Sequence, residues 1–273
     1  SGGNLATARR DLAGAGTQTA GLSMGGDTGS YTGTTEEYDG SSWSGGGSLI
    51  TARAELAGCG TQTAGLCMGG TPAIADEDTE EYDGSSWSAG GDLGTGRSHL
   101  AACGTQIAGL CMGGAGSSVV TEEYNGTSWS SGGNLATGRY SLAGAGTQTA
   151  GLSIGGTTGS VSAITEEYNG TAWSSGGNLA TARSTLAGGG TQTAGLCMGG
   201  DTGSVSAVTE EYNGTAWSSG GNLATARSRL AGAGTQALGL CMGGHVTGVV
   251  NTTEEYVGGS GSYDELFTAS QGL

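Results

Sequence analysis

The chain has 273 residues, of which 61 are glycine and one is proline, and its formal net charge at pH 7 is −16. It contains eight arginines and no lysine. So acidic a chain repels phosphate backbones, which argues against nucleic acid as a partner. No run approaches the roughly 18 apolar residues of a membrane span, and no basic or apolar leader follows Ser1. We therefore expect a soluble protein with no membrane insertion and no signal peptide in this chain.

A repeat of about 44 residues organises the whole chain. Its marker is the arginine of a Thr-Ala-Arg or Thr-Gly-Arg triplet, and successive arginines are 44, 44, 42, 44 and 44 residues apart. The six repeat arginines are Arg9, Arg53, Arg97, Arg139, Arg183 and Arg227. Periods of this length are typical of solenoids and propellers, so each arginine should mark the start of one structural unit.

Four short extended segments can be predicted in each unit, and none has a helical period. In the fifth unit they are 186–190, 194–198, 209–212 and a segment that runs from Trp217 towards Leu223. Gly-Thr-Gln joins the first two, and an Asn-Gly or Asp-Gly dipeptide, which favours tight hairpins, joins the last two. In the second segment Leu196 and Met198 should face one neighbouring unit and Cys197 the other. Each unit is thus predicted to be a four-stranded antiparallel meander that stacks radially on its neighbours.

The two ends of the chain must close the ring. Residues 1–5 align with 219–223, the end of a fourth segment, whereas the sixth unit loses the pattern after Tyr256. Either the N-terminal segment completes the sixth unit, or residues 263–267 supply its outer strand with Tyr263 in place of the missing tryptophan. We expect residues 1–260 to form a single six-bladed propeller and residues 261–273 to be a closing strand or a flexible tail.

Three recurring features of the units resemble kelch repeats: a Gly-Gly doublet that ends the second segment, a Glu-Tyr pair in the third, and a tryptophan that opens the fourth. The tyrosines are Tyr38, Tyr82, Tyr124, Tyr168, Tyr212 and Tyr256, and the tryptophans are Trp43, Trp87, Trp129, Trp173 and Trp217. The resemblance implies an all-β fold, a six-bladed kelch-like β-propeller. The near-identity of the units also resembles repeat arrays of marine phage proteins, which implies a viral protein on a virion surface or outside the cell.

The repeated charges and the cysteines have structural interpretations. We expect each repeat arginine to pair with one of the repeated glutamates between neighbouring blades. The six cysteines stand where other units have alanine, glycine or serine, which favours small buried thiols. No Cys-x-x-Cys spacing occurs, so we expect free thiols, although bridges within the second or third unit stay open.

The units differ mainly at one end of the predicted ring, where the loops between segments two and three and between successive units emerge. Binding residues commonly lie on loops that a rigid scaffold holds. The candidate ligand-binding residues at this end are Arg10, Asp11, Tyr31, Glu55, His99, Tyr140, Arg229 and His245. Asp76, Glu77 and Asp78 are weak candidates for a cation site, because they lack the spacing of an EF-hand.

These observations favour a non-enzymatic binding or display module that is lectin-like and recognises a glycan or protein partner, with no cofactor. The alternative is a structural repeat or assembly scaffold without a small-molecule ligand. A third hypothesis is a kelch enzyme of the copper-oxidase type. The resemblance would then require two histidines that act together, and His99 and His245 belong to units on opposite sides of the ring.

Overall fold

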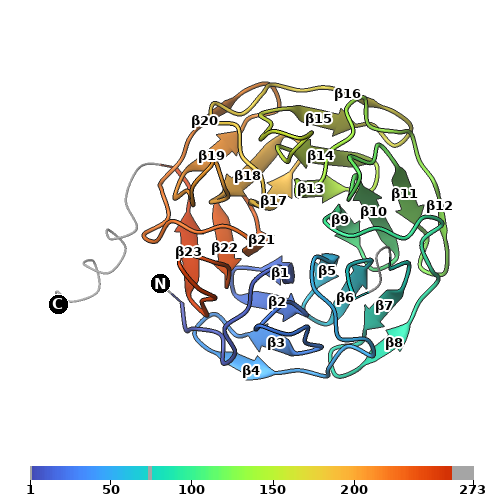
Figure 1. Ribbon diagram of the computed structural model, residues 1–273, viewed down its shortest axis with the longest axis vertical. Coiled ribbons are helices and arrows are strands. Elements are labelled where there is room, and N and C mark those ends of the chain that lie inside the picture. The colour runs from blue at the N-terminus through green and yellow to red at the C-terminus, as the bar shows by residue number, and fades with distance from the viewer. Residues whose placement is uncertain (1, 73–75, 260–273) are drawn as a thin grey trace, which may run out of the picture.

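The computed structural model describes residues 2–72 and 76–259. Within these residues, 23 β-strands form six antiparallel sheets that stand as blades around a central axis (Figure 1). The predicted all-β, six-bladed architecture is confirmed. The described part of the chain has no helix that is long and apolar enough to cross a membrane.

The strands follow one another in chain order within each blade. Blades one to three contain β1 (Ala13–Thr17), β2 (Ala20–Met24), β3 (Thr35–Tyr38), β4 (Trp43–Gly45), β5 (Ala57–Thr61), β6 (Ala64–Met68), β7 (Thr79–Tyr82), β8 (Trp87–Ala89), β9 (Ala101–Thr105), β10 (Ala108–Met112), β11 (Thr121–Tyr124) and β12 (Trp129–Ser131). Blades four to six contain β13 (Ala143–Thr147), β14 (Ala150–Ile154), β15 (Thr165–Tyr168), β16 (Trp173–Ser175), β17 (Ala187–Thr191), β18 (Ala194–Met198), β19 (Thr209–Tyr212), β20 (Trp217–Ser219), β21 (Ala231–Gly234), β22 (Leu238–Met242) and β23 (Thr253–Val257). The sixth blade has three strands among the described residues, and the other five have four.

The first strand of each blade lies next to the axis (Figure 1). These innermost strands, β1, β5, β9, β13, β17 and β21, consist largely of glycine and alanine. The composition follows from crowding at the axis: a Cβ on Gly14 would lie 2.7 Å from the carbonyl oxygen of Gly232 in the neighbouring blade. The high glycine content therefore lets six strands converge around a narrow axis.

The second strand of each blade packs on both of its neighbours, as the alternation predicted. Leu196 and Met198 are buried in a cluster with Cys241 of blade six. Cys197 is buried in a separate cluster with Leu152 of blade four. Large side chains on one face of a blade thus pack against small ones on the next, and the hydrophobic core is divided into layers between blades.

The invariant Gly-Thr-Gln turn also joins neighbouring blades. The amide nitrogen of Gln62 donates to the carbonyl oxygens of Gly21 and Tyr38 in the preceding blade, at 3.1 and 2.7 Å. The equivalent glutamines make the same two bonds around the ring: Gln18, Gln106, Gln148, Gln192 and Gln236. This between-blade contact explains why the turn sequence does not vary.

The ring closes between blades six and one. Trp43 Nε1 donates to Thr253 Oγ1 at 3.0 Å, and the Tyr38 hydroxyl donates to Glu255 at 2.8 Å. The N-terminal segment also lies against blade six, where the backbone N–H of Leu5 donates to the carbonyl oxygen of Asn251 at 2.9 Å. The alternative closing segment, residues 263–267, and the expected tail, residues 261–273, lie outside the described residues.

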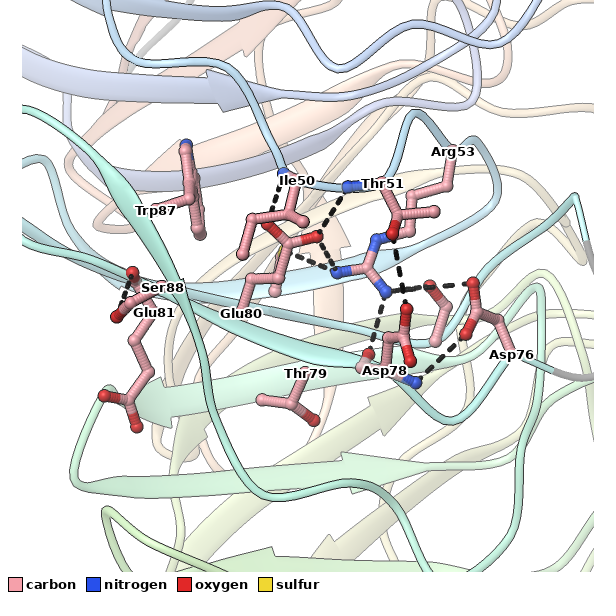
Figure 2. A network of polar contacts seen from close by, with 12 residues as sticks. Ile50, Thr51, Arg53, Asp76, Asp78, Thr79, Glu80, Glu81, Trp87 and Ser88 are labelled. Atoms are coloured by element: carbon pink, nitrogen blue, oxygen red, sulfur yellow. Dashed lines mark hydrogen bonds and ion pairs between the residues drawn. The ribbon is translucent and has the colours of Figure 1, made fainter.

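Each repeat arginine is buried in a polar network within its own blade, and Figure 2 shows the network of Arg53. Arg53 Nη2 lies 2.8 Å from Glu80 Oε1, and its Nη1 donates to the carbonyl oxygen of Asp78 at 2.8 Å. The other oxygen of Glu80 accepts the backbone N–H of Ile50 at 2.7 Å. The prediction of arginine–glutamate pairs is thus right, but their placement between blades is wrong. Arginine and glutamate meet because the chain enters each blade beside the third strand of that same blade.

The second glutamate of each repeated pair makes the contact between blades. The Tyr124 hydroxyl donates to Glu81 Oε1 of the preceding blade at 2.6 Å. Burial, followed by this hydrogen bond to a carboxylate, raises the pKa of Tyr124 to about 12. The tyrosine therefore stays a neutral hydrogen-bond donor at neutral pH.

All six cysteines are free and buried, as expected. Burial raises the pKa of Cys103 to about 12. Burial is also the largest cause that raises the pKa of the other five thiols. Burial thus favours the neutral thiol, whereas the reactive form of cysteine is the thiolate.

Candidate ligand-binding site

A closed circle of six residues surrounds the axis at the end of the ring where the units differ. Each lies two positions after a repeat arginine, and we call the set the mouth ring: Asp11, Glu55, His99, Ser141, Thr185 and Arg229. The backbone N–H of each donates to the carbonyl oxygen of the preceding member, at 2.8 or 2.9 Å. The bond from Asp11 to Arg229 closes the circle at 2.9 Å. The backbone of the mouth is therefore the same in all six blades.

Every residue of the mouth ring has a left-handed backbone conformation, with φ between 50° and 59°. This conformation costs a residue with a Cβ about 1–2 kcal/mol and costs glycine almost nothing. Among the described residues, every other position with positive φ is glycine except Ser117. A chain this rich in glycine nevertheless carries six different side chains where glycine would be least strained. Strain of this kind is a reason to suspect a functional role for those side chains.

The mouth ring surrounds a cavity of about 120 Å³. Six leucines form its floor, one directly after each mouth residue: Leu12, Leu56, Leu100, Leu142, Leu186 and Leu230. A second cavity, of about 90 Å³, is lined by these leucines and by the first residues of the innermost strands. The leucines therefore separate a polar mouth from an axial space walled by glycine and alanine.

The charges of the mouth ring are gathered on one side of it. Arg229 Nη1 lies 3.3 Å from Asp11 Oδ2, and His99 Nδ1 lies 3.1 Å from Glu55 Oε2. These four residues occupy consecutive positions and form a charged arc. Ser141 and Thr185 complete the circle with two hydroxyl groups. The mouth thus offers carboxylates, a guanidinium, an imidazole and hydroxyls around one small opening.

Burial acts on both carboxylates of the charged arc. It raises the pKa of Asp11, against the opposing effect of the Arg229 guanidinium. It also raises the pKa of Glu55, against the opposing effect of His99. Both groups have lost part of their hydration without full compensation by their partners. A ligand that donates hydrogen bonds to them would restore part of that loss.

The predicted site residues that are not part of the mouth ring lie outside the cavity lining. Arg10 is held by Asp27, with Nη2 at 2.8 Å from Oδ2, and this hydrogen bond is the main reason why the pKa of Arg10 is raised. The Tyr140 ring meets the His99 ring edge-on, with centroids 6.2 Å apart. The residue that precedes each member of the mouth ring lies beside the loop between the second and third strands of its blade. Arg10 pairs there with Asp27, and Ser228 pairs with His245, by backbone hydrogen bonds. They form a rim around the mouth.

The structure thus brings four predicted residues together in the cavity: Asp11, Glu55, His99 and Arg229. It places Arg10, Tyr140 and His245 on the rim, and Tyr31 on a loop with 46 % of its surface exposed. The sequence-based set missed Ser141 and Thr185, which stand at the same position of the repeat. Both follow a repeat arginine by two positions, but neither a serine nor a threonine stands out from ordinary loop sequence.

Two of the weak cation candidates, Asp76 and Asp78, contact protein groups through their side chains. Asp76 Oδ1 accepts the backbone N–H of Asp78 at 3.0 Å, and Asp76 Oδ2 lies 3.9 Å from Arg53 Nη1 (Figure 2). Glu77 contributes its carbonyl oxygen to the backbone N–H of Leu93. Within residues 2–72 and 76–259, no group of three or more His, Cys, Asp or Glu side chains could hold a metal ion.

Comparisons with known proteins show the fold. No family model matches the chain, and no curated protein sequence matches it significantly. Among solved structures, 239 chains match, and one of them is YjhT, with a TM-score of 0.76 and 12 % sequence identity. The match covers 93 % of this chain and 96 % of that one. This chain is a six-bladed β-propeller. Since one fold hosts many unrelated functions, the function must be argued from the mouth.

Proposed function

We propose that this chain is a non-enzymatic binding module that recognises a surface ligand, a glycan or a protein, through the mouth end. The observation that carries the proposal is the mouth ring, in which six different side chains stand on one repeated and strained backbone. We call the buried residues of the blades, including the repeat arginines, the wall of the ring. The wall supplies the stability, so the side chains of the mouth are available for recognition.

The size and chemistry of the mouth favour the end group of a larger ligand. Pockets for whole drug-sized ligands hold about 300–1,000 Å³, and this cavity holds about 120 Å³. A sugar residue at the end of a glycan, or one polar side chain of a protein, would present hydroxyl, amide or charged groups to the mouth ring. Asp11 and Glu55 accept hydrogen bonds from such groups, and Arg229 donates them.

The geometry of the mouth supports binding more than catalysis. Glu55, His99 and Ser141 occupy consecutive positions, in the order of a hydrolytic triad. His99 Nδ1 lies 3.1 Å from Glu55 Oε2 and 3.3 Å from Ser98 Oγ, and among the described residues no hydrogen bond joins the side chain of His99 to that of Ser141. The backbone N–H groups of the mouth ring all donate to neighbouring carbonyls, so they are not free to stabilise an oxyanion. The copper-oxidase hypothesis is also weakened, because His245 lies on the rim and not beside His99 in the cavity lining.

Two finer assignments stay predictions from resemblance. The kelch assignment rests on the Gly-Gly, tyrosine and tryptophan pattern of the units. The location on a phage virion or outside the cell rests on the near-identity of those units. A scaffold without a small ligand is the alternative function, and it predicts no specific role for the mouth side chains.

Binding arrays of glycans and of peptides test the proposal. The purified chain is compared with a mouth variant that carries Asp11→Asn, Glu55→Gln, His99→Gln and Arg229→Gln. The control is Ile107→Thr, which changes a residue that is 71 % exposed in a Gly-Thr-Gln turn at the opposite end of the ring. Four other units have threonine at this position: Thr19, Thr63, Thr149 and Thr193. The control variant should therefore fold normally.

We expect selective binding that the mouth variant loses and the control keeps. Binding that survives in the mouth variant would contradict the proposed site. Failure to bind any array member, together with concentration-dependent assembly in light scattering, would favour the scaffold.

A further inference from the structure

The two carboxylates of the mouth ring lie beside each other. The backbone N–H of Glu55 donates to the carbonyl oxygen of Asp11 at 2.9 Å, and both residues line the mouth cavity. Burial raises the pKa of Glu55 most and the charge of Asp11 raises it further, whereas His99 and Arg229 oppose both effects. Burial also raises the pKa of Asp11, and Arg229 and His99 again oppose it. The four charged side chains therefore act on one another across a single small opening.

The charge balance of the mouth argues against an anionic ligand. Asp11 and Glu55 supply two negative charges, and Arg229 and His99 supply at most two positive ones, so no positive charge is left over. The described ion pairs of Asp11, with Arg229 at 3.3 Å and with Arg10 at 3.8 Å, both use Oδ2. Within the described part of the chain, Asp11 Oδ1 therefore remains available as an acceptor. Since both carboxylates have lost hydration, they would gain more from charged donors than from neutral hydroxyls.

The charge of the whole chain points in the same direction. It has 24 acidic residues, eight arginines and no lysine. The six repeat arginines each pair with a glutamate of their own blade, at 2.7–3.1 Å. The other two, Arg10 and Arg229, pair with Asp27 and Asp11 at 2.8 and 3.3 Å. Every arginine is thus already paired with a carboxylate, and the net charge of −16 attracts a positively charged partner.

The rim adds a further negative group close to the mouth. Asp27 and Asp201 stand at the same place in blades one and five, where backbone bonds join them to Arg10 and Ser184. Arg10 neutralises Asp27, whereas a serine cannot neutralise Asp201. Among the described residues, Asp201 therefore has no ion pair. Ser184 directly precedes the mouth residue Thr185, so Asp201 lies on the rim beside the mouth.

We propose that the mouth binds a cationic side chain, a lysine ammonium or an arginine guanidinium, that a basic protein presents. This inference rests on the function proposed above and names the class of its ligand. One such end group suits a cavity of about 120 Å³, where Asp11 and Glu55 accept its hydrogen bonds. A basic segment of a protein carries cationic groups a few residues apart, so a second one can reach Asp201 on the rim. A neutral glycan would leave this charge complementarity unused.

The direct probe is a peptide, Gly-Ser-Lys-Ser-Gly-Lys-Ser-Gly, with a fluorescent label that blocks its N-terminal amine. Its binding to the full chain is followed by fluorescence anisotropy at about 0.15 M ionic strength, where distant surface charges are largely screened. The same peptide with both lysines acetylated keeps its backbone and loses its charges. We expect the first peptide to bind and the second not to bind. Equal binding of the two peptides, or no binding of the lysine peptide, would overturn the proposal.

Two double variants of equal net charge separate the mouth from the overall field. Asp11→Asn/Glu55→Gln removes two negative charges from the mouth. It should weaken binding of the lysine peptide roughly ten- to hundredfold, the loss expected for hydrogen bonds to a charged group. Asp39→Asn/Asp83→Asn removes two charges from turns at the opposite end of the ring, and it should change the affinity less than about twofold. Equal losses in the two variants would show that only the overall charge attracts the peptide, which would overturn the site.

The substitutions of this comparison suit the fold. Other units already have asparagine at the two control positions: Asn125, Asn169 and Asn213. Asp39 Oδ1 accepts the backbone N–H of Ser42 at 2.7 Å, and Asn125 Oδ1 accepts that of Ser128 at 2.9 Å. In the mouth, position 11 has φ 52°, a left-handed conformation that asparagine adopts more readily than most residues. Both double variants should therefore melt no lower than the parent chain.

The rim group should have a smaller effect than the mouth pair. Asp201→Asn removes a half-buried charge at the rim, so we expect the lysine peptide to bind roughly two- to fivefold more weakly. A loss larger than that of Asp11→Asn/Glu55→Gln would place the cation on the rim and overturn the mouth site.

A competition experiment tests the pocket in the unmodified chain. Propylammonium chloride is added to the complex of the chain with the lysine peptide, and sodium chloride at the same concentration is the control. Because an alkylammonium ion donates hydrogen bonds as a lysine side chain does, it should release the peptide more strongly than sodium. Equal release by the two salts would contradict recognition of an organic cation.

The glycan array of the proposed function is measured in parallel. Glycan binding that the mouth variant loses, without binding of the lysine peptide, would keep the proposed function and overturn this inference. Absence of binding to the glycans and to all peptides would contradict both.

Discussion

Two positions that lie two residues apart in every unit behave in opposite ways. The repeat arginine is the same in all six blades, and its side chain is buried in each. The mouth residue that follows differs in all six blades, and its side chain lines an open cavity. Because the backbone is shared, the difference separates what the fold requires from what it leaves open for recognition.

The strongest test of this comparison is the removal of one repeat arginine. Arg139 is fully buried, and it contacts Glu166, Ser153 and three backbone carbonyls. Arg139→Met would leave Glu166 as an uncompensated buried charge, so we expect a loss of about 3–5 kcal/mol in the free energy of unfolding. Urea denaturation followed by tryptophan fluorescence measures it.

The matched control is an arginine of the mouth. Arg229 is 45 % exposed and pairs with Asp11 at 3.3 Å, so Arg229→Gln should cost less than about 1 kcal/mol. The double variant Arg139→Met/Glu166→Gln should regain part of the loss, because it removes both charges. Similar losses for Arg139→Met and Arg229→Gln would break the distinction between wall and mouth.

A smaller effect of opposite sign is expected at Thr185. Its side chain is β-branched and stands at φ 50°, which is an unfavourable backbone conformation for such a residue. Thr185→Gly should therefore raise the free energy of unfolding by up to about 1 kcal/mol, or about 2–4 °C in melting temperature. Calorimetry would detect the shift, and a clear destabilisation would show that Thr185 supports the fold.

The carboxylate of Glu55 should make stability depend on pH. Burial raises the pKa of Glu55 above its value in the unfolded chain, so its ionised form destabilises the folded state. This penalty is present above the raised pKa and disappears as the pH falls below about 4, where both states are protonated. Glu55→Gln should thus melt slightly higher than the parent chain at pH 7 and match it near pH 3.5. A variant that melts lower at pH 7 would contradict this account.

The smallest effect on stability is expected at the buried position that accepts a hydrogen bond from the repeat arginine, where some blades have cysteine and others serine. Arg53 Nη2 donates to Cys67 Sγ at 3.4 Å, and the equivalent arginines of blades one and four donate to Ser23 and Ser153. Cys67→Ser should therefore change the free energy of unfolding by less than about 1 kcal/mol. A loss as large as that of Arg139→Met would show that the blades are less interchangeable than their networks indicate.

The repeat made most of the fold predictable. The predicted third segment of the fifth unit matches β19 (Thr209–Tyr212), because turn dipeptides and alternation mark its ends. The fourth strand, β20, starts at Trp217 as predicted but ends at Ser219, well before Leu223. A Cβ at the next residue, Gly220, would lie 2.3 Å from the Tyr256 hydroxyl, so this part of the chain serves the close packing of the next blade.

The mouth was predictable only in part. Charged residues such as Asp11 and Arg229 stand out in the loops, whereas Ser141 resembles ordinary loop sequence. The closed circle of backbone bonds and the leucine floor depend on six units meeting at one axis, which no single unit encodes. His245 and Tyr31 belong to the correct end of the ring, but their distance from the axis follows from loop conformation.

The most direct measurement is the free energy of unfolding of a variant with glycine at all six mouth positions. If the mouth side chains serve recognition, the variant should be at least as stable as the parent chain, because the left-handed strain is relieved and the backbone circle is kept. A loss of more than about 2 kcal/mol would show that these side chains hold the ring together, and it would contradict the separation of wall and mouth.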